Sequence, residues 1–136
     1  MKVAVIYSTT TGNTEAVANL INEELVANGA EVVFGTADSA DAGAVLACDV
    51  ILLGSPAMGD EVLEDTMEDF YSANEAALSG KKVAVFGSYD WGDGQFLRDW
   101  EDRLKAAGAV LAAPYLMVHL APENPAEVKN WAKSVL

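Results

Sequence analysis

Four consecutive hydroxyl residues open the segment Ser8-Thr9-Thr10-Thr11-Gly12-Asn13-Thr14, which also holds a glycine and an asparagine. It follows residues 2–7, expected to form a buried strand, and leads into a helix expected from Glu15 to about residue 28. Backbone N–H groups and the positive end of the helix dipole would converge in this turn, which suits a phosphate. A hydroxyl-rich helix cap without a ligand is the alternative.

The same turn lacks the signatures of two common nucleotide-binding loops. A nucleoside-triphosphate loop needs a Gly-Lys pair preceded by another glycine with four residues between the two glycines, and no lysine follows Gly12. A dinucleotide-binding turn needs three glycines, and only Gly12 is present. Lys and Arg are absent from residues 3–80, so neutral donors would hold a phosphate here unless the C-terminal half reaches over.

A second distinctive loop, Ser55-Pro56-Ala57-Met58-Gly59-Asp60-Glu61, follows an apolar strand expected over residues 50–54. A methionine in a tight loop is poorly placed to fill the core, and its thioether can lie against a flat ring. The pair Gly59-Asp60 can form the centre of a β-turn, with positive φ on Asp60 in type II or on Gly59 in type II′, so its central peptide can flip at modest cost. An ordinary turn with Met58 packed at the surface is the alternative.

A third loop, residues 87–94, places Trp91 among glycines and polar residues. A tryptophan there either anchors the loop to the core or presents its ring to a ligand, and Tyr89 nearby favours an aromatic wall. In contrast, Trp100 and Trp131 fall on helical apolar stripes and are expected to pack.

Strands and helices alternate along the chain. Strands are expected over residues 2–7, 31–34, 50–54, 82–86 and 110–118, the last interrupted at Pro114. Helices are expected over residues 15–28, 41–46 with Asp41 as cap, 62–78 with a break near 72–74, 95–107 and 125–135. The pattern predicts one α/β domain, residues 1–136, with a doubly wound five-stranded parallel sheet in the order 2-1-3-4-5. The three loops would then converge where the strand order reverses, which is where ligands bind in such sheets.

The net charge is −13, and nearly all of the excess lies in residues 1–80, which contain a single lysine. This argues against nucleic acid and anionic membrane as partners and favours a basic protein partner, although solubility alone would also explain the charge. The single Cys48 excludes an internal disulfide and a multi-cysteine metal site. With no expected signal peptide or spanning segment, we expect a cytoplasmic protein.

The three loops together resemble those of the flavodoxin family. The first matches the T/S-x-T-G-N-T phosphate loop, and residues 57–61 and 88–94 are similar to the two isoalloxazine loops of short-chain, clostridial-type flavodoxins. The resemblance runs the full length of the chain. The chain departs from the family pattern in two places. Relatives usually carry glycine at the position of Asp90, and close relatives often have a glycine within Thr9-Thr10.

The resemblance implies a low-potential carrier with non-covalently bound FMN, which passes single electrons between redox enzymes and moves between quinone, semiquinone and hydroquinone. The phosphate would be held by the hydroxyls of Ser8, Thr9, Thr11 and Thr14 with the N–H groups of residues 9–14. Met58 and Trp91 would cover the two ring faces, Glu61 would accept from N3–H, and the Gly59 carbonyl would turn toward N5. The implied cofactor-binding set is Ser8, Thr9, Thr10, Thr11, Gly12, Asn13, Thr14, Pro56, Ala57, Met58, Gly59, Asp60, Glu61, Ser88, Tyr89, Asp90, Trp91, Gly92 and Asp93.

The acidic residues near these loops would place the ring in a negative field, which disfavours the second electron and makes the lower step strongly reducing. No catalytic acid, base or nucleophile is evident, and His119 is expected to be at most a neighbour of the site. By analogy, the partners would be reductases and low-potential oxidoreductases with basic docking surfaces. The protein itself is expected to be a monomer.

Three alternatives remain open. An FMN-dependent NAD(P)H or quinone oxidoreductase would need room over the ring, which Trp91 would occupy. A phospho-acceptor receiver domain would need Asp after the third strand and Lys after the fifth, where the chain has Gly54-Ser55 and Val118-His119. A flavin-binding sensor or assembly module would differ from a carrier in its reduction behaviour.

Overall fold

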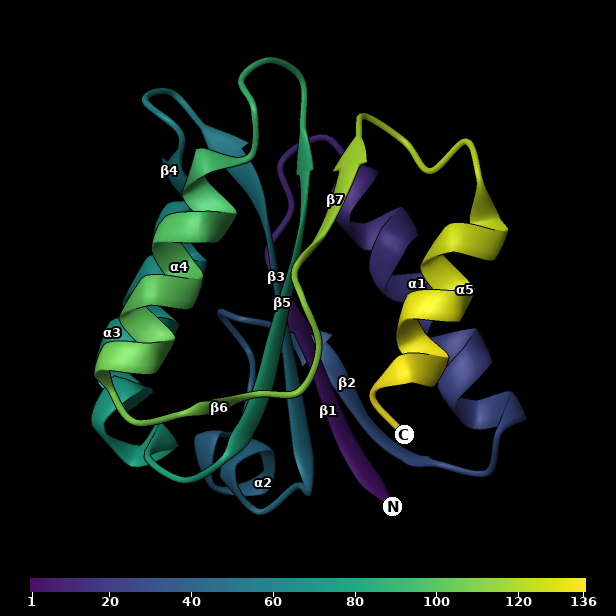
Figure 1. Cartoon of the computed structure of the whole chain (residues 1–136), viewed down its shortest axis with the longest axis vertical. Coiled ribbons are helices and arrows are strands. Elements are labelled where there is room, and N and C mark those ends of the chain that lie inside the picture. The colour runs from purple at the N-terminus through teal and green to yellow at the C-terminus, as the bar shows by residue number, and fades with distance from the viewer.

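The computed structural model describes residues 1–136 and has a twisted sheet as its middle layer (Figure 1). The sheet holds seven strands in the order β2-β1-β3-β5-β6, with β7 also paired to β5 and β4 paired to β3. The strands are β1 Lys2–Tyr7, β2 Glu31–Thr36, β3 Val50–Met58, β4 Val62–Leu63, β5 Lys82–Tyr89, β6 Val110–Leu111 and β7 Leu116–His119. All pairs are parallel except β3 with β4, so helical crossovers cover both faces.

The helices divide between the two faces of the sheet (Figure 1). Helices α1 (Asn13–Ala27) and α5 (Pro125–Ser134) cover one face, and α3 (Asp65–Asn74) and α4 (Gln95–Ala106) cover the other. The short helix α2 (Ala42–Leu46) and the 3-10 helix η1 (Glu75–Leu78) complete the second layer. No helix is long and apolar enough to cross a bilayer.

Each face of the sheet has its own apolar core, because successive strand residues point to opposite sides. In β1, Val3 and Val5 belong to the core beneath α1 and α5, whereas Ala4 and Ile6 belong to the core beneath α3 and α4. The two cores contain 17 buried residues each, so neither layer dominates the packing. Both lie below the edge where the three distinctive loops emerge.

The predicted strand order and the predicted break at Pro114 are confirmed. The expected fifth strand is present as β6 and β7, which pair with the two ends of β5 on either side of Pro114. Pro114 lacks an N–H group for the ladder, and its carbonyl oxygen accepts the indole N–H of Trp131 at 2.7 Å. Asp41 caps α2 as predicted, by accepting the N–H of Gly43 at 3.0 Å.

The prediction of a helix from residue 62 is wrong at its beginning. Val62 and Leu63 form β4, which turns back on the end of β3 and pairs with Met58 and Ala57. Leu63 is buried there, so the apolar pair serves a hairpin rather than a first helical turn. The helix starts at Asp65 after its cap, Glu64, and gives way to η1 at residue 75, near the predicted break.

An ion-pair cluster joins α3 to α4. Both guanidinium Nη atoms of Arg103 donate to Glu68, at 2.7 and 2.8 Å, and Arg103 Nε lies 3.5 Å from Glu75. The guanidinium carbon of Arg103 also lies 4.6 Å from the centre of the Tyr71 ring. The hydrogen bonds from Arg103 hold the pKa of Glu68 below its usual 4.5, although partial burial acts in the opposite direction.

We expect this cluster to make the stability of the fold depend on pH in the acid range. A lowered carboxyl pKa stabilises the fold above the unfolded value near 4.5, and the stabilisation is lost as the pH falls through the folded value. Glu68→Gln should therefore lower the free energy of unfolding at pH 7 by up to about 1 kcal/mol after solvent screening. The difference from the unsubstituted protein should shrink below about pH 4.

The measurement is urea unfolding of both proteins at a series of pH values. Glu23→Gln, at an exposed residue of α1 outside the ion pairs, is the matched control and should show no such trend. A Glu68→Gln difference that stays constant from pH 3 to pH 7 would contradict the assignment.

Gly54 allows β3 to pass close to the Phe86 ring. A Cβ atom added at Gly54 would overlap the ring atoms of Phe86, which is fully buried and has no room to move. Gly54 also pairs with Tyr7 of β1, and its carbonyl accepts the N–H of Ser8 at 2.9 Å. The close approach therefore lies directly beneath the segment 8–14.

Gly54→Ala should destabilise the fold by about 1–3 kcal/mol, because an inserted methyl group must displace a buried ring. The measurement is the shift of the urea midpoint at constant slope. Gly35→Ala is the matched control, since an added Cβ on this edge-strand residue meets no atom within 4 Å. Equal midpoints for the two variants would show that the Phe86 contact has no such effect.

Candidate functional site

The three distinctive loops meet at the carboxyl edge of the sheet, where they enclose a groove of about 200 Å³. In Figure 1 this edge lies at the top, where the ends of β3, β5 and β7 come together. The groove is lined by Thr10, Thr11, Asn13, Pro56, Ala57, Ser88, Tyr89, Asp90 and Leu120. Eight of these nine residues were predicted from the sequence, and they come from all three loops.

The turn before α1 leaves the N-terminus of this helix open toward the groove. Gly12 occupies the N-cap position with a φ of 89°, and no side chain caps the helix. The Thr9 hydroxyl accepts the N–H of Gly12 at 3.0 Å, which folds the turn back on itself. The first N–H groups of α1 have no partner within the helix, so they are available to an anion. The helix starts two residues before Glu15, so Asn13 and Thr14 belong to its first turn.

Two buried hydroxyls lock the first turn of α1 to β5. Thr14 Oγ1 lies 2.6 Å from Ser88 Oγ, and both residues are almost fully buried. Ser8 is also buried, and its hydroxyl has no hydrogen-bond partner. Ser8 and Thr14 therefore lie below the groove rather than on its surface. The exposed hydroxyls of this turn that line the groove are those of Thr10 and Thr11.

The hairpin between β3 and β4 has a turn other than the predicted one. Met58 pairs with Val62, so the connection is Gly59, Asp60 and Glu61. Neither Gly59 nor Asp60 has a positive φ, and the left-handed residue is Glu61 with a φ of 53°. Three-residue hairpin loops commonly place their left-handed residue third, and this geometry replaces the predicted type II or II′ pair. Met58 is half-buried at the end of β3 and is not a loop residue.

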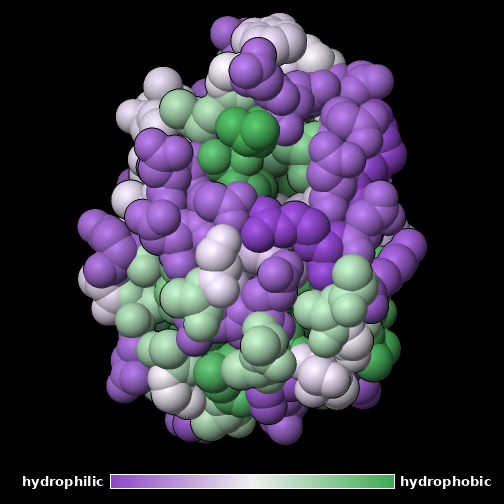
Figure 2. Space-filling view, turned by 90° about the vertical axis from the view of Figure 1, so that its left-hand side faces the viewer, coloured by the Kyte–Doolittle hydropathy of each residue, from purple (hydrophilic) through white to green (hydrophobic).

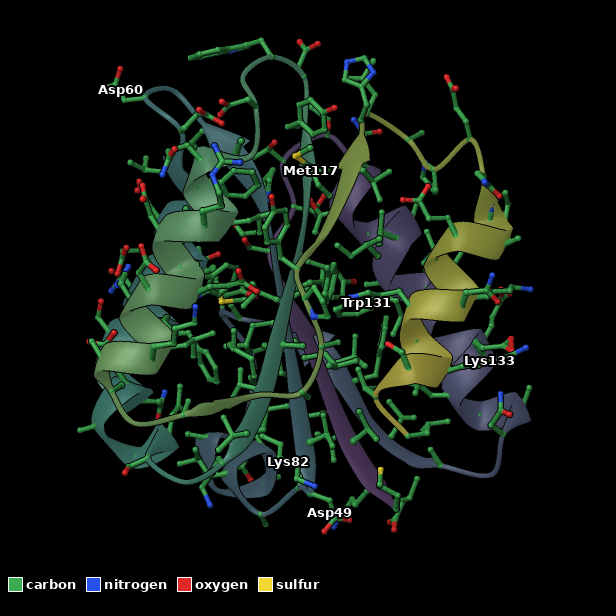
Figure 3. The ribbon with its side chains drawn as sticks, in the orientation of Figure 1. Asp49, Asp60, Lys82, Met117, Trp131 and Lys133 are labelled. Carbon is green, nitrogen blue, oxygen red and sulfur yellow. The ribbon has the colours of Figure 1, made fainter.

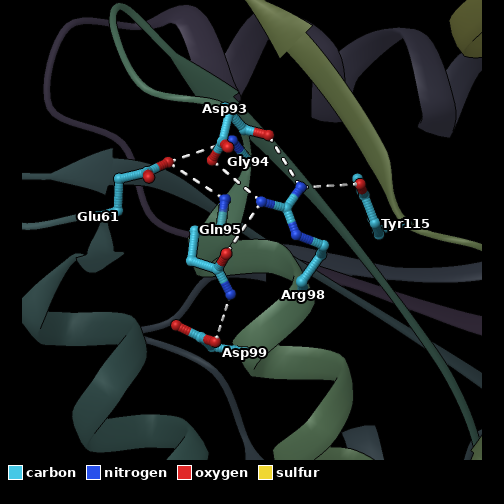
Figure 4. Close-up of polar contacts among 7 residues, drawn as sticks. All are labelled: Glu61, Asp93, Gly94, Gln95, Arg98, Asp99 and Tyr115. Atoms are coloured by element: carbon cyan, nitrogen blue, oxygen red, sulfur yellow. Dashed lines mark hydrogen bonds and ion pairs between the residues drawn. The ribbon is translucent and has the colours of Figure 1, made fainter.

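The Glu61 carboxylate caps a helix from across the site (Figure 4). Glu61 Oε1 accepts the N–H groups of Gly94 at 3.1 Å and Gln95 at 3.2 Å, at the beginning of α4. Helix α4 has no cap from its own N-cap residue, Gly94. A Cβ atom added at Gly92 would lie 2.6 Å from Glu61 Oε1, so the hairpin and the third loop are in close contact.

The third loop begins later than expected, because β5 continues to Tyr89. We call residues 90–94 the ring loop. Trp91 is 63% exposed, which excludes the alternative that it anchors the loop to the core. Trp100, in contrast, is 1% exposed, as its helical stripe predicted. The ring loop therefore holds an indole out beside the groove.

The end of β7 supports the beginning of the ring loop. His119 Nε2 lies 3.0 Å from the carbonyl oxygen of Asp90, so this nitrogen is the donor, and the His119 ring lies 5.0 Å from that of Tyr89. Leu120 donates its N–H to the Tyr89 carbonyl at 2.8 Å while its φ is 55°. His119 is thus the neighbour of the site that was predicted.

Leu120 and Ser55 are site residues that the sequence reasoning missed. Leu120 lines the groove, but a leucine after a strand gives no signal that it takes a left-handed conformation. Ser55 is fully buried, donates to the carbonyl of Pro56 at 2.9 Å and accepts the N–H of Glu64 at 3.0 Å, which joins the two ends of the hairpin. Its position directly after the strand expected over residues 50–54 was the signal in the sequence that could have identified Ser55 as a site residue.

Several predicted residues flank the groove without lining it. They form the hairpin and the ring loop: Met58, Gly59, Asp60, Glu61, Trp91, Gly92 and Asp93.

The lining contains no cation, and Asp90 is its one charged residue. In Figure 3, Asp60 lies at the end of the molecule where the loops meet, whereas Lys82 lies at the opposite end near Asp49. Burial raises the pKa of Glu64, but hydrogen bonds from Thr66 outweigh it, so this pKa lies below its ordinary value.

The fold and the groove define a class of protein: a doubly wound α/β domain with an uncapped helix N-terminus at its switch point, which is where such domains bind their ligands. A flavodoxin family model matches residues 5–131 of the chain. The chain is 41% identical to a flavodoxin of Megasphaera elsdenii over 94% of its own length and 93% of the relative's. It is 40% identical to a flavodoxin of Clostridium beijerinckii, with 88% of each chain covered.

Solved structures agree with these relatives. The solution structure of two-electron reduced Megasphaera elsdenii flavodoxin superimposes with a TM-score of 0.90, covering 98% of this chain and 97% of that one at 40% identity. The crystal structure of oxidised flavodoxin 2 from Bacillus cereus superimposes with a TM-score of 0.88 at 39% identity, covering 99% of this chain and 97% of that one. The chain belongs to the flavodoxin family, and it is therefore an FMN-binding electron-transfer protein rather than an enzyme.

The Thr14–Ser88 contact yields a prediction for the floor of the site. Thr14→Val should destabilise the fold by about 1–3 kcal/mol, because it leaves the Ser88 hydroxyl buried without a partner. Adding Ser88→Ala should recover part of that loss, since both polar groups are then removed. The free energies of unfolding come from urea titration of the two variants without added ligand. A double variant that is no more stable than Thr14→Val would contradict this account.

Proposed function

We propose that residues 1–136 form one domain that carries single electrons at low potential on a non-covalently bound FMN, with the phosphate in the turn 8–14. The observation that carries the proposal is the open N-terminus of α1, which faces a groove bounded by the two loops able to hold a ring. The residues present fit a phosphate dianion, because backbone N–H groups and the hydroxyls of Thr10 and Thr11 are exposed there. FMN supplies the reversible one-electron chemistry, and the chain supplies binding and electrostatics.

The two flanking loops would enclose the ring. Trp91 offers an exposed indole from the ring loop, and Met58 lies at the end of β3 on the hairpin. Glu61 binds the start of α4 through Oε1 alone, which leaves Oε2 for the ring N3–H. The remaining implied residues, Ser8 and Thr14 among them, would act from beneath by shaping the turn.

The charge of the surroundings would lower the potential of the second electron. Acidic residues gather on the hairpin, on α3 and on the ring loop. They are Asp60, Glu61, Glu64, Asp65, Glu68, Asp69, Asp90 and Asp93. On the α3 and α4 side, Figure 2 shows hydrophilic side chains around an apolar patch in the upper half and a mixed surface below it. With no cation in the groove lining, a ring that gains negative charge there meets repulsion that only bulk solvent and neutral donors offset.

The same field supports a proposal about partners. Redox proteins with basic docking surfaces would be steered to the end of the molecule where Asp60 and the exposed Trp91 lie. A monomer keeps that end free for more than one partner. The single free and buried cysteine fits a cytoplasmic location, where disulfides are rare.

The test is an absorbance spectrum of the purified protein during stepwise anaerobic reduction. We expect bound FMN to pass through a long-wavelength, one-electron-reduced form before bleaching, because the second electron is disfavoured. Direct two-electron bleaching would favour an oxidoreductase on the same fold. A protein that takes up no flavin even when FMN is supplied would overturn the proposal.

A further inference from the structure

Arg98 makes four polar contacts at the point where the ring loop joins α4 (Figure 4). Its Nη1 donates to the carbonyl oxygen of Asp93 at 3.0 Å and to the Tyr115 hydroxyl at 3.5 Å. Its Nη2 donates to the carboxylate of Asp93 at 3.0 Å and to Gln95 Oε1 at 3.0 Å. One guanidinium thus joins the end of the loop, the first turn of α4 and the segment between β6 and β7.

The same stretch of backbone is held from the other side by Glu61. The Glu61 carboxylate accepts the N–H groups of Gly94 and Gln95, while Arg98 donates to the carbonyl of Asp93. The peptide group between Asp93 and Gly94 is therefore bound by a cation at its carbonyl and by an anion at its N–H, and the same anion also binds the next N–H, that of Gln95. Gly94, with a φ of 86°, also lies against Met117, where a Cβ atom would overlap the sulfur. The backbone at this junction has little freedom to take another path.

We propose that Arg98 is a positioning residue of the site, whose guanidinium holds the end of the ring loop and so determines where Trp91 lies beside the ring. His119 already holds the start of this loop through the carbonyl of Asp90. Trp91 lies between these two bound carbonyls and is 63% exposed, so its position depends largely on the path of the loop backbone. The part of this inference that concerns the ring rests on the proposed function.

The shape of the guanidinium, rather than its charge, is what this role requires. The pair of Arg98 with Asp93 is solvated, with side chains 38% and 77% exposed, so its Coulomb energy contributes little. A planar fork, however, can bind a carbonyl and a carboxylate of one residue together, which a lysine ammonium on a flexible stem does not reproduce. The proposal therefore predicts that Arg98→Lys fails even though it keeps the charge.

The first experiment is amide hydrogen exchange of the purified protein, with and without its flavin, for Arg98→Met and Arg98→Lys. Both should speed exchange of the ring loop and of Gly94 and Gln95 by about 3- to 10-fold, the effect of losing a hydrogen bond. Arg103→Met is the control, because Arg103 lies on the same helix and also forms ion pairs, with Glu68 and Glu75, but does not touch the loop. It should leave these amides unchanged relative to the rest of the chain.

The second measurement is the separation between the two one-electron midpoint potentials of the flavin. We expect both Arg98 variants to change it and Arg103→Met to leave it as in the unsubstituted protein. Wild-type exchange and potentials in Arg98→Lys would show that charge alone acts, and they would overturn the proposal. Faster exchange spread evenly over the whole chain would also overturn it, as a general loss of stability. If no protein of the set binds FMN, the proposed function fails, while the exchange comparison still decides the role of Arg98.

Discussion

The reversal of strand order beside β1 is the constraint on which the rest of the structure depends. The chain leaves β1 to pair with β2 on one side and returns to pair with β3 on the other. The crossovers therefore diverge at the carboxyl edge, and the space between them stays open. The turn before α1 enters that space and leaves the first N–H groups of the helix without a partner in the helix or a side-chain cap. The Thr14–Ser88 hydrogen bond then fixes the turn against β5 and so holds the floor of the groove in place beneath the loops.

The loops above this floor are held by charged groups, although the groove itself contains almost none. Glu61 and Arg98 act on the backbone of the ring loop from opposite sides and both lie outside the groove lining. A helix N-terminus can attract an anion because of its dipole, and α4 uses that property on Glu61, whereas α1 leaves it for a ligand. Two helices with glycine at the N-cap position thus have different roles, decided by whether a carboxylate from the chain can reach them.

Sequence reasoning succeeded where a local signal existed. Asp41 before α2 and Pro114 between β6 and β7 both act as their residue types predict. It failed at Val62, because an apolar pair before an acidic segment reads equally well as a first helical turn or as a short strand. The cap that Glu61 gives to Gln95 spans 34 positions, and no pattern within either segment announces it. Most residues of the groove could be predicted because they directly follow the carboxyl ends of strands, which the sequence indicates. Contacts between loops depend on tertiary structure, which the sequence does not indicate.

The backbone at Asp90 does not require a glycine. A positive φ favours glycine, and the positive φ values of non-glycine residues fall at Glu61 and Leu120, not at Asp90. An aspartate therefore causes no strain there, and its carbonyl is held by His119. Leu120 adopts the unfavourable conformation instead, at a cost of about 1 kcal/mol, while its N–H binds Tyr89. The left-handed non-glycine residues of the site are thus Glu61 and Leu120, and Asp90 adds negative charge to the groove without backbone strain.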